Sequence, residues 1–93
     1  MKESLVEELK FGTDGLLPVA VTDHQSGRLL VLCFLNREAL ETTVKEGHVH
    51  VYRRSMGQVQ KKGVSSGHVQ RVREIRVNCD MNSLEIQVEQ EVA

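Results

Sequence analysis

Two segments of the chain carry side chains whose types and spacing suit chemistry, and the first is Asn78-Cys79-Asp80-Met81-Asn82. A thiol and a carboxylate lie there between two amides. A Cys79 thiolate can bind zinc, whereas Asp80 and the two amide oxygens suit a harder cation. One cysteine and one carboxylate do not complete a tetrahedral site. The residues alone therefore favour a turn that carries a cysteine over a metal site.

The second segment is the stretch YRRSMGQVQKKGVSSGHVQR, from Tyr52 to Arg71, which is rich in groups that bind anions. Arginine offers a planar fork of donors and lysine a point charge, while serine hydroxyls and glycine-permitted backbone N–H groups add further donors. The residues of this kind are Arg53, Arg54, Ser55, Lys61, Lys62, Gly63, Ser65, Ser66 and Gly67. No GxxxxGK[ST] phosphate loop is present, and on spacing alone a solvated basic hairpin with a Gly/Ser turn is favoured over an anion site.

The histidines form a third group of candidates. His48 and His50 alternate along an expected strand and so share one face, and His68 follows the Gly/Ser stretch. Such a pair can bind a metal, and each histidine can act as an acid or base near neutral pH. Histidines on the surface of a strand explain the same pattern without any chemistry.

The elements that must position these groups are mostly strands. Apolar and alternating runs predict strands over 16–23, 28–35, 48–55 and 58–62, and the first two form a hairpin through the turn residues 24–27. The run 28–35 is apolar on both faces, which predicts a central strand with Cys33 buried inside it.

The end of the chain is expected to form a second hairpin. Ile75 and Val77 alternate with polar residues, as do Leu84, Ile86 and Val88, and the segment 79–83 joins the two runs. One helix is predicted over about 36–46, because Asn36 can cap its start and Gly47 its end. The expected fold is a single α+β domain over 1–93, with a mostly antiparallel β-sheet and one main α-helix.

Composition limits the possible partners. The chain of 93 residues has a formal net charge of −1, which gives no overall attraction to nucleic acid or membrane. No run approaches the roughly 20 apolar residues that cross a bilayer, and the acidic start is unlike a signal peptide. Two cysteines are too few for a disulfide framework, so we expect a reducing, cytoplasmic location. With three aromatic residues the core is modest, and a dimer would extend it.

From about Leu9 to Gln90, an ordered series of motifs resembles the phosphoribosyl-AMP cyclohydrolase family. They include LKFGTDGLLPVAV, FLNREAL, KGVSSGHVQ, EIR and CD. The resemblance implies the third step of histidine biosynthesis, in which the purine N1–C6 bond of phosphoribosyl-AMP is opened by a zinc-activated water with magnesium assisting. It also implies an intertwined homodimer whose two chains contribute jointly to each active site.

The resemblance assigns roles to individual residues of this chain. Those expected to hold the phosphorylated purine nucleotide are Arg54, Ser55, Lys62, Gly63, Ser65, Ser66 and Gly67, with Ser65 in place of the usual threonine. His50 and His68 occupy positions where the family often has histidine and are the candidate catalytic residues. Cys79 corresponds to a zinc ligand and Asp80 to a magnesium ligand.

The chain also departs from the family pattern. Asn78 and Asn82 replace two aspartates of Asp-Cys-Asp-x-Asp, so they are weaker candidate ligands and two formal charges are lost. The family pattern continues into a Cys-His pair and a final cysteine, whereas the sequence ends at Ala93. We therefore expect either a cyclohydrolase with a remodelled metal site that includes histidine, or a non-catalytic nucleotide- or phosphate-binding homodimer. Completion by another polypeptide is a third alternative.

Overall fold

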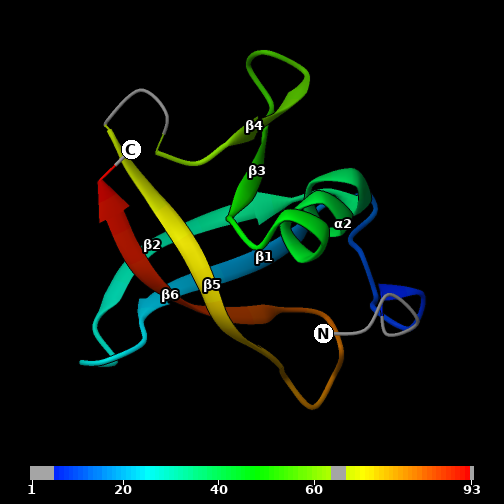
Figure 1. The fold of residues 1–93 in the computed structure, drawn as a ribbon. Helices are drawn as coiled ribbons and strands as arrows, with labels where there is room; N and C mark the ends of the chain where they lie inside the picture. The colour runs from blue at the N-terminus through cyan, green and yellow to red at the C-terminus, as the bar shows by residue number, and fades with distance from the viewer. Residues whose placement is uncertain (1–5, 64–66, 93) are drawn as a thin grey trace.

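The computed structural model describes residues 6–63 and 67–92 (Figure 1). The elements follow one another as β1 (Leu17–Asp23), β2 (Leu29–Leu35), α2 (Arg37–Glu46), β3 (His50–Arg53), β4 (Gln58–Lys61), β5 (His68–Val77) and β6 (Leu84–Val92). The predicted α+β class, with strands around one main helix, is confirmed.

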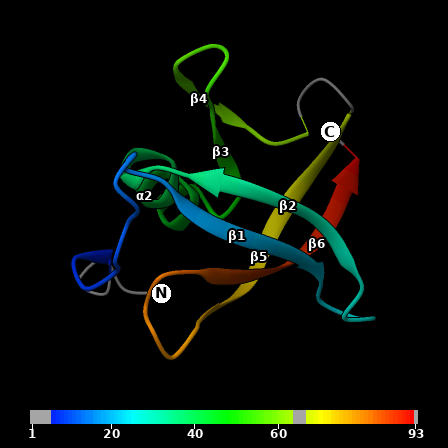
Figure 2. The ribbon, with the colours of Figure 1, turned by 180° about the vertical axis from the view of Figure 1, so that it is seen from behind.

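The strands form two sheets. A four-stranded sheet has the order β2-β1-β6-β5, and β3 pairs with β4 in a separate two-stranded ribbon (Figures 1 and 2). The pairs β1–β2, β5–β6 and β3–β4 are antiparallel as predicted. The central pair β1–β6 is parallel, with Val19 opposite Leu84. Pro18 precedes this parallel ladder, so its missing N–H leaves no gap in the ladder.

Backbone hydrogen bonds join the two-stranded ribbon to the larger sheet. The N–H of Val49 donates to the carbonyl of Gln70 (3.0 Å), and the N–H of Val72 donates to the carbonyl of Gly47 (2.8 Å). The N–H of Lys62 in turn donates to the carbonyl of Val49 (2.8 Å). These bonds hold residues 52–63, which we call the basic segment, at a fixed place beside β5.

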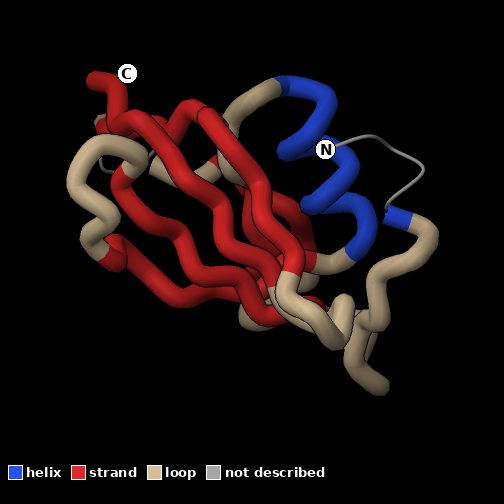
Figure 3. Tube along the Cα trace, turned by 90° about the horizontal axis from the view of Figure 1, so that it is seen from below, coloured by secondary structure: helices blue, strands red, loops and turns tan. Residues whose placement is uncertain are grey.

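The helix begins and ends at the predicted residues. The side chain of Asn36 accepts a hydrogen bond from the N–H of Ala39 (2.8 Å), and Gly47 ends the helix with a left-handed φ of 76°. Figure 3 shows the helix lying on one side of the strands. Leu40 is fully buried and Val44 is partly buried, so both contribute to the inner side of the helix.

The core lies around the two central strands and the helix. The fully buried apolar side chains come from β1, the end of β2, the helix, β6 and residues outside these elements, and the largest are Leu17, Leu35, Leu40, Ile86, Val6 and Val19. Their removal from water is the main favourable contribution to folding in a chain of this size.

The prediction that 28–35 is a central strand was wrong. β2 lies at the edge of its sheet, and among the described strands it pairs with β1 alone. Leu29, Leu32 and Phe34 keep 54%, 71% and 45% of their surface exposed, and Cys33 is only partly buried. Apolar residues on both faces do indicate that both faces are covered, but within this chain only one face of β2 packs on the core.

Candidate functional site

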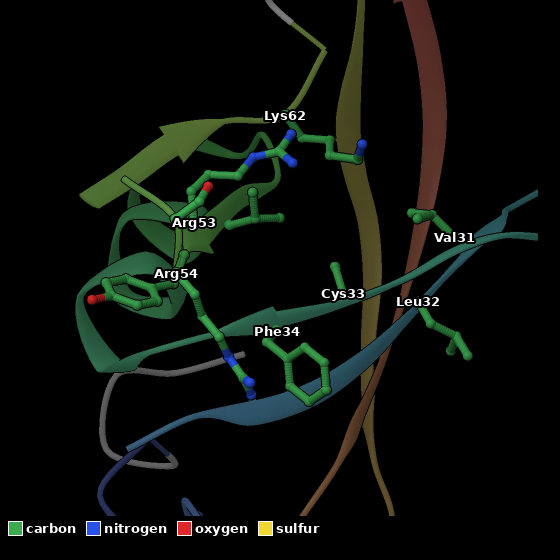
Figure 4. Close-up of a pocket in the computed structure, with 10 residues that line it drawn as sticks. Val31, Leu32, Cys33, Phe34, Arg53, Arg54 and Lys62 are labelled. Atoms are coloured by element: carbon green, nitrogen blue, oxygen red, sulfur yellow. The ribbon is translucent and has the colours of Figure 1, made fainter. Parts of the chain in front are cut away.

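A pocket of about 420 Å³ lies between β2 and the start of the basic segment. Arg53, Arg54, Ser55 and Lys62 line it from the two-stranded ribbon, and Val31–Phe34 line it from β2. Figure 4 shows Arg53 and Lys62 on one side of this hollow and Cys33, Leu32 and Phe34 on the other. We call it the basic pocket. Its volume is typical of small-ligand sites.

The three cations of the basic pocket are not equally engaged. Arg54 Nη2 lies 3.2 Å from Asp14 Oδ2, and its guanidinium lies 5.0 Å from the ring centroid of Phe34. Within residues 6–63 and 67–92, Arg53 and Lys62 form no ion pair. The pocket therefore combines uncompensated positive charge with an apolar wall, an arrangement that suits an anion attached to an apolar group.

The Cys33 thiol reports on the electrostatics of this pocket. Burial raises its pKa to about 11, and the nearby charges of Lys62 and Arg53 oppose that rise. The thiol is therefore protonated near neutral pH, which makes it a poor metal ligand. Its Sγ lies 3.7 Å from the carbonyl oxygen of Val19.

A second pocket of about 410 Å³ adjoins the basic pocket, because Val31 and Lys62 line both. Gly63, His68, Gln70 and Gln90 contribute to its remaining wall. We call it the glutamine pocket. Ser65 and Ser66, two of the residues predicted to bind phosphate, lie outside the described residues.

Gly63 has a conformation and surroundings that only glycine satisfies. Its φ is +91°, and a Cβ atom built there would overlap the carbonyl oxygen of His68. The N–H of His68 also donates to the carbonyl of Gly63 (3.1 Å). This close approach holds the end of the basic segment against the start of β5, whereas Gly67 has a positive φ with open space around it.

The histidines lie in different surroundings. His68 lines the glutamine pocket, while His50 lies against the helix and is 7% exposed. Its Nδ1 is 2.8 Å from the carbonyl oxygen of His48, and its Nε2 is 3.5 Å from Glu46 Oε2. His48 Nε2 instead lies 3.3 Å from Glu91 Oε1. The rings of His48 and His50 thus contact different carboxylates and do not converge on one point.

The segment 78–82 forms the turn between β5 and β6, as predicted. Asn78 Oδ1 accepts hydrogen bonds from the N–H groups of Asn82 and Ser83 (3.0 Å each). Asn78 Nδ2 donates to Asn82 Oδ1 (2.6 Å). Both amide oxygens are therefore used within the turn itself.

The donor atoms of this turn do not fit a metal ion in the structure. Cys79 and Asp80 are exposed, and no cluster of three or more His, Cys, Asp or Glu residues with metal-binding geometry exists in the described part of the chain. The turn offers one thiol and one carboxylate, which is fewer than the ligands that a structural or catalytic zinc requires.

Several residues of the two pockets were not expected from the sequence. The apolar wall of the basic pocket comes from β2, which had been placed in the middle of a sheet, and Gln70 had no assigned role. The sequence feature that could have indicated this wall is the presence of apolar residues on both faces of β2. Lys61, although basic and adjacent, does not line either pocket.

The fold and the pockets define a small α+β protein with a basic pocket beside an apolar strand. A sequence model of the phosphoribosyl-AMP cyclohydrolase family matches residues 31–93. The phosphoribosyl-AMP cyclohydrolase of Azotobacter vinelandii is 43% identical over 97% of this chain and 67% of its own length. That of Rhodopseudomonas palustris is 47% identical over 97% of this chain and 61% of its own length. The chain belongs to the phosphoribosyl-AMP cyclohydrolase family.

A third relative is similar to a comparable degree. The phosphoribosyl-AMP cyclohydrolase of Methanococcoides burtonii is 41% identical over 92% of this chain and 71% of its own length. The chain spans about two thirds of the length of the curated relatives it matches. No helix among the described residues is long and apolar enough to cross a membrane.

Proposed function

We propose that this chain binds phosphoribosyl-AMP, a phosphorylated purine nucleotide, as the substrate-binding part of a phosphoribosyl-AMP cyclohydrolase in histidine biosynthesis. The observation that carries the proposal is the basic pocket, where two cations that form no ion pair with any described residue face the apolar wall of β2. Membership of the family supports phosphoribosyl-AMP as the ligand of this pocket.

The side chains of the basic pocket suit the two parts of the nucleotide. Arg53 and Arg54 can each donate two parallel hydrogen bonds to a phosphate, and Ser55 and Lys62 add single donors. The exposed faces of Leu32 and Phe34 offer an apolar surface to the purine. The Arg54 guanidinium above the Phe34 ring would shield one edge of the base from water.

The reaction proposed for the bound nucleotide is hydrolytic opening of its purine ring. The oxygen of a water molecule bonds to C6 and the N1–C6 bond breaks. One proton of the water goes to N1 and the other to the exocyclic nitrogen on C6, so that C6 becomes a carboxamide. We assign the proton transfer to His68 in preference to His50, because His68 lines the glutamine pocket next to the nucleotide. Cys79 and Asp80 are the side chains that this chain would offer to zinc or magnesium, and further ligands would have to come from elsewhere.

A homodimer is part of the proposal. β2 has an unpaired edge, and its neighbouring apolar side chains Leu32 and Phe34 are exposed, which in a single copy would favour aggregation. A second copy that covers this strand would bury them and close the basic pocket. We expect a dimer by analytical ultracentrifugation and a monomer for Leu32→Lys. A wild-type protein that is monomeric at high concentration would contradict this part of the proposal.

Binding without turnover is the second candidate function. It is favoured by the turn 78–82, where the amide oxygens of Asn78 and Asn82 are held in hydrogen bonds within the turn. In that case the basic pocket keeps its ligand, but no metal is fixed beside the purine ring.

Calorimetry on the purified protein tests the binding. Wild-type protein should release heat with phosphoribosyl-AMP, and Lys62→Met or Arg54→Ala should weaken binding roughly 10- to 100-fold, the loss expected for a charge-assisted hydrogen bond. Lys61→Met removes an adjacent positive charge outside the pocket and is the matched control. Equal losses for Lys62→Met and Lys61→Met would mean that only the overall charge matters, and the absence of heat would refute binding.

Turnover and metal content then separate the two candidates. Ring opening changes the ultraviolet spectrum of the nucleotide, so the reaction can be followed with zinc and magnesium added. If Cys79→Ser abolishes both turnover and zinc binding, the result supports the catalytic function. Tight binding without turnover at any metal concentration supports the second candidate, and zinc content unchanged in Cys79→Ser excludes Cys79 as a ligand.

A further inference from the structure

Gln70 of β5 carries a polar atom that lacks a partner. The residue is 6% exposed, and its Oε1 is the one buried side-chain oxygen or nitrogen without a hydrogen bond among the described residues. A buried acceptor without a donor is costly, and such atoms are rare in folded proteins. The position therefore needs an explanation beyond packing.

Contacts on both sides hold the backbone of Gln70 in place. Its carbonyl accepts the N–H of Val49 (3.0 Å), and it lies opposite Gln90 in the β5–β6 ladder. The residue is thus fixed on both sides, at the junction between the sheet and the two-stranded ribbon. Gln70 is one of the residues that line the glutamine pocket, which contains space of about 410 Å³.

The glutamine pocket is continuous with the proposed nucleotide site. Lys62 and Val31 line both pockets, so one elongated ligand can occupy the two together. Phosphoribosyl-AMP has such a shape, because a second phosphorylated sugar is attached to the adenine ring. With the AMP part in the basic pocket, this second sugar would extend past Lys62 into the glutamine pocket.

We propose that Gln70 is a specificity-determining residue whose Oε1 accepts a hydrogen bond from a hydroxyl of this second sugar. The inference rests on the proposed function and deepens it. A phosphate cannot be the partner, because an amide oxygen and an anion are both acceptors. The sugar hydroxyl is the donor that the second phosphoribosyl group brings. A ligand without that sugar leaves Oε1 unpaired, so Gln70 selects for phosphoribosyl-AMP against AMP.

A water molecule bound to Oε1 is the competing explanation, and it makes a different prediction. In that case Gln70 has only a structural role, and its replacement changes stability without changing the preference between two ligands. The comparison of phosphoribosyl-AMP with AMP separates the two explanations.

The experiment measures the affinity of both nucleotides for wild type, Gln70→Met and the control Gln87→Met. Gln87 is a partly buried glutamine of β6 whose Oε1 already contacts His24 Nδ1 at 3.2 Å. We expect Gln70→Met to weaken the binding of phosphoribosyl-AMP about tenfold or more, the loss expected for a hydrogen bond to a buried acceptor. The affinity for AMP should change less than twofold. We also expect the melting temperature of Gln70→Met without ligand to equal or exceed that of wild type, because the unpaired oxygen is gone.

A ligand-side measurement makes the test independent of how well the variant folds. An analogue of phosphoribosyl-AMP that lacks the 2′- or the 3′-hydroxyl of the second sugar should bind wild type about tenfold more weakly in one of the two cases. For that analogue Gln70→Met should cause no further loss, since the two changes remove the same hydrogen bond.

The outcomes distinguish the inference from the function on which it rests. If wild type binds neither nucleotide, the proposed function fails and the inference fails with it. If wild type binds phosphoribosyl-AMP but both deoxy analogues bind equally well, only the inference fails. If Gln70→Met weakens the binding of AMP and of phosphoribosyl-AMP equally and lowers the melting temperature, Gln70 has a structural role and the inference fails.

Discussion

Alkylation of Cys33 should be slow near neutral pH and should keep accelerating to an unusually high pH. Burial raises the pKa of this thiol from 9.0 to about 11, even though Lys62 and Arg53 act in the opposite direction. Only the thiolate reacts with an alkylating agent. The reaction rate therefore follows the titration of a group that lies in the wall of the basic pocket.

The size of the effect follows from the pKa. At pH 8 a thiol of pKa 11 is about 0.1% thiolate, and one of pKa 9.0 is about 9%, so the reactive fraction falls about a hundredfold. A more basic thiolate is also a better nucleophile, by roughly tenfold over two pKa units. The net rate at pH 8 should then be about tenfold below that of an ordinary thiol, and restricted access through the pocket lowers it further.

The assay uses iodoacetamide and mass spectrometry on Cys79→Ser, which leaves Cys33 as the one thiol, and Cys33→Ser provides the exposed thiol for comparison. Between pH 9 and 10 the rate at Cys33 should still rise nearly tenfold. Lys62→Met should slow it, because removing that positive charge raises the pKa further. A rate that levels off below pH 9.5 would refute the reasoning.

The same electrostatics give a sensor for the proposed ligand. A phosphate beside Lys62 and Arg53 cancels part of the charge that favours the thiolate, and the bound nucleotide also covers the thiol. Phosphoribosyl-AMP should therefore slow alkylation of Cys33 and leave Cys79 unaffected, since Cys79 lies in the exposed turn between β5 and β6. Equal protection of both cysteines would point to a global change instead.

Three further predictions concern stability, measured as the free energy of unfolding in urea. Gly63→Ala should cost more than about 3 kcal/mol, because its Cβ would overlap the His68 carbonyl, whereas Gly57→Ala has open space and should cost only about 1–2 kcal/mol for its positive φ; equal losses would contradict the overlap. Asn36→Ala should cost about 1 kcal/mol through loss of the helix cap, and no change would mean that the cap is not needed. Asn78→Ala should cost about 1–2 kcal/mol by removing the acceptor of two N–H groups, while Asn78→Asp keeps an acceptor and should cost less; the reverse order would refute this role.

The elements that depend on local signals were predictable from the sequence. The helix followed from Asn36 and Gly47, which are close to each other along the chain and act through backbone geometry that these residue types favour. The turn 78–82 followed from polar residues between two alternating runs. In these cases the residues that decide the structure lie within about a dozen positions of one another.

The arrangement of the strands depends on contacts between distant residues and was not predictable in detail. The parallel pairing of β1 with β6 brings Val19 beside Leu84, and the separate ribbon of β3 and β4 is joined to β5 through Val49. No short motif encodes such contacts, because they are decided by which surfaces remain to be covered after the hairpins form. The basic segment was recognisable by composition, but its apolar wall and Gln70 became evident only from this arrangement.

The wrong placement of β2 carries information about function. Apolar residues on both faces normally mean that both faces are covered. Here one face packs on the core, and the other presents Leu32 and Phe34 to the basic pocket and to solvent. A chain with few aromatic residues would not leave one on an unpaired edge strand unless something covers it, because such an edge invites uncontrolled pairing. A nucleotide base and a second copy of the chain are the two occupants that the proposed function supplies. The apolar residues on both faces of β2 wrongly predicted a central strand in the single chain. They are explained if the strand becomes central in the liganded dimer.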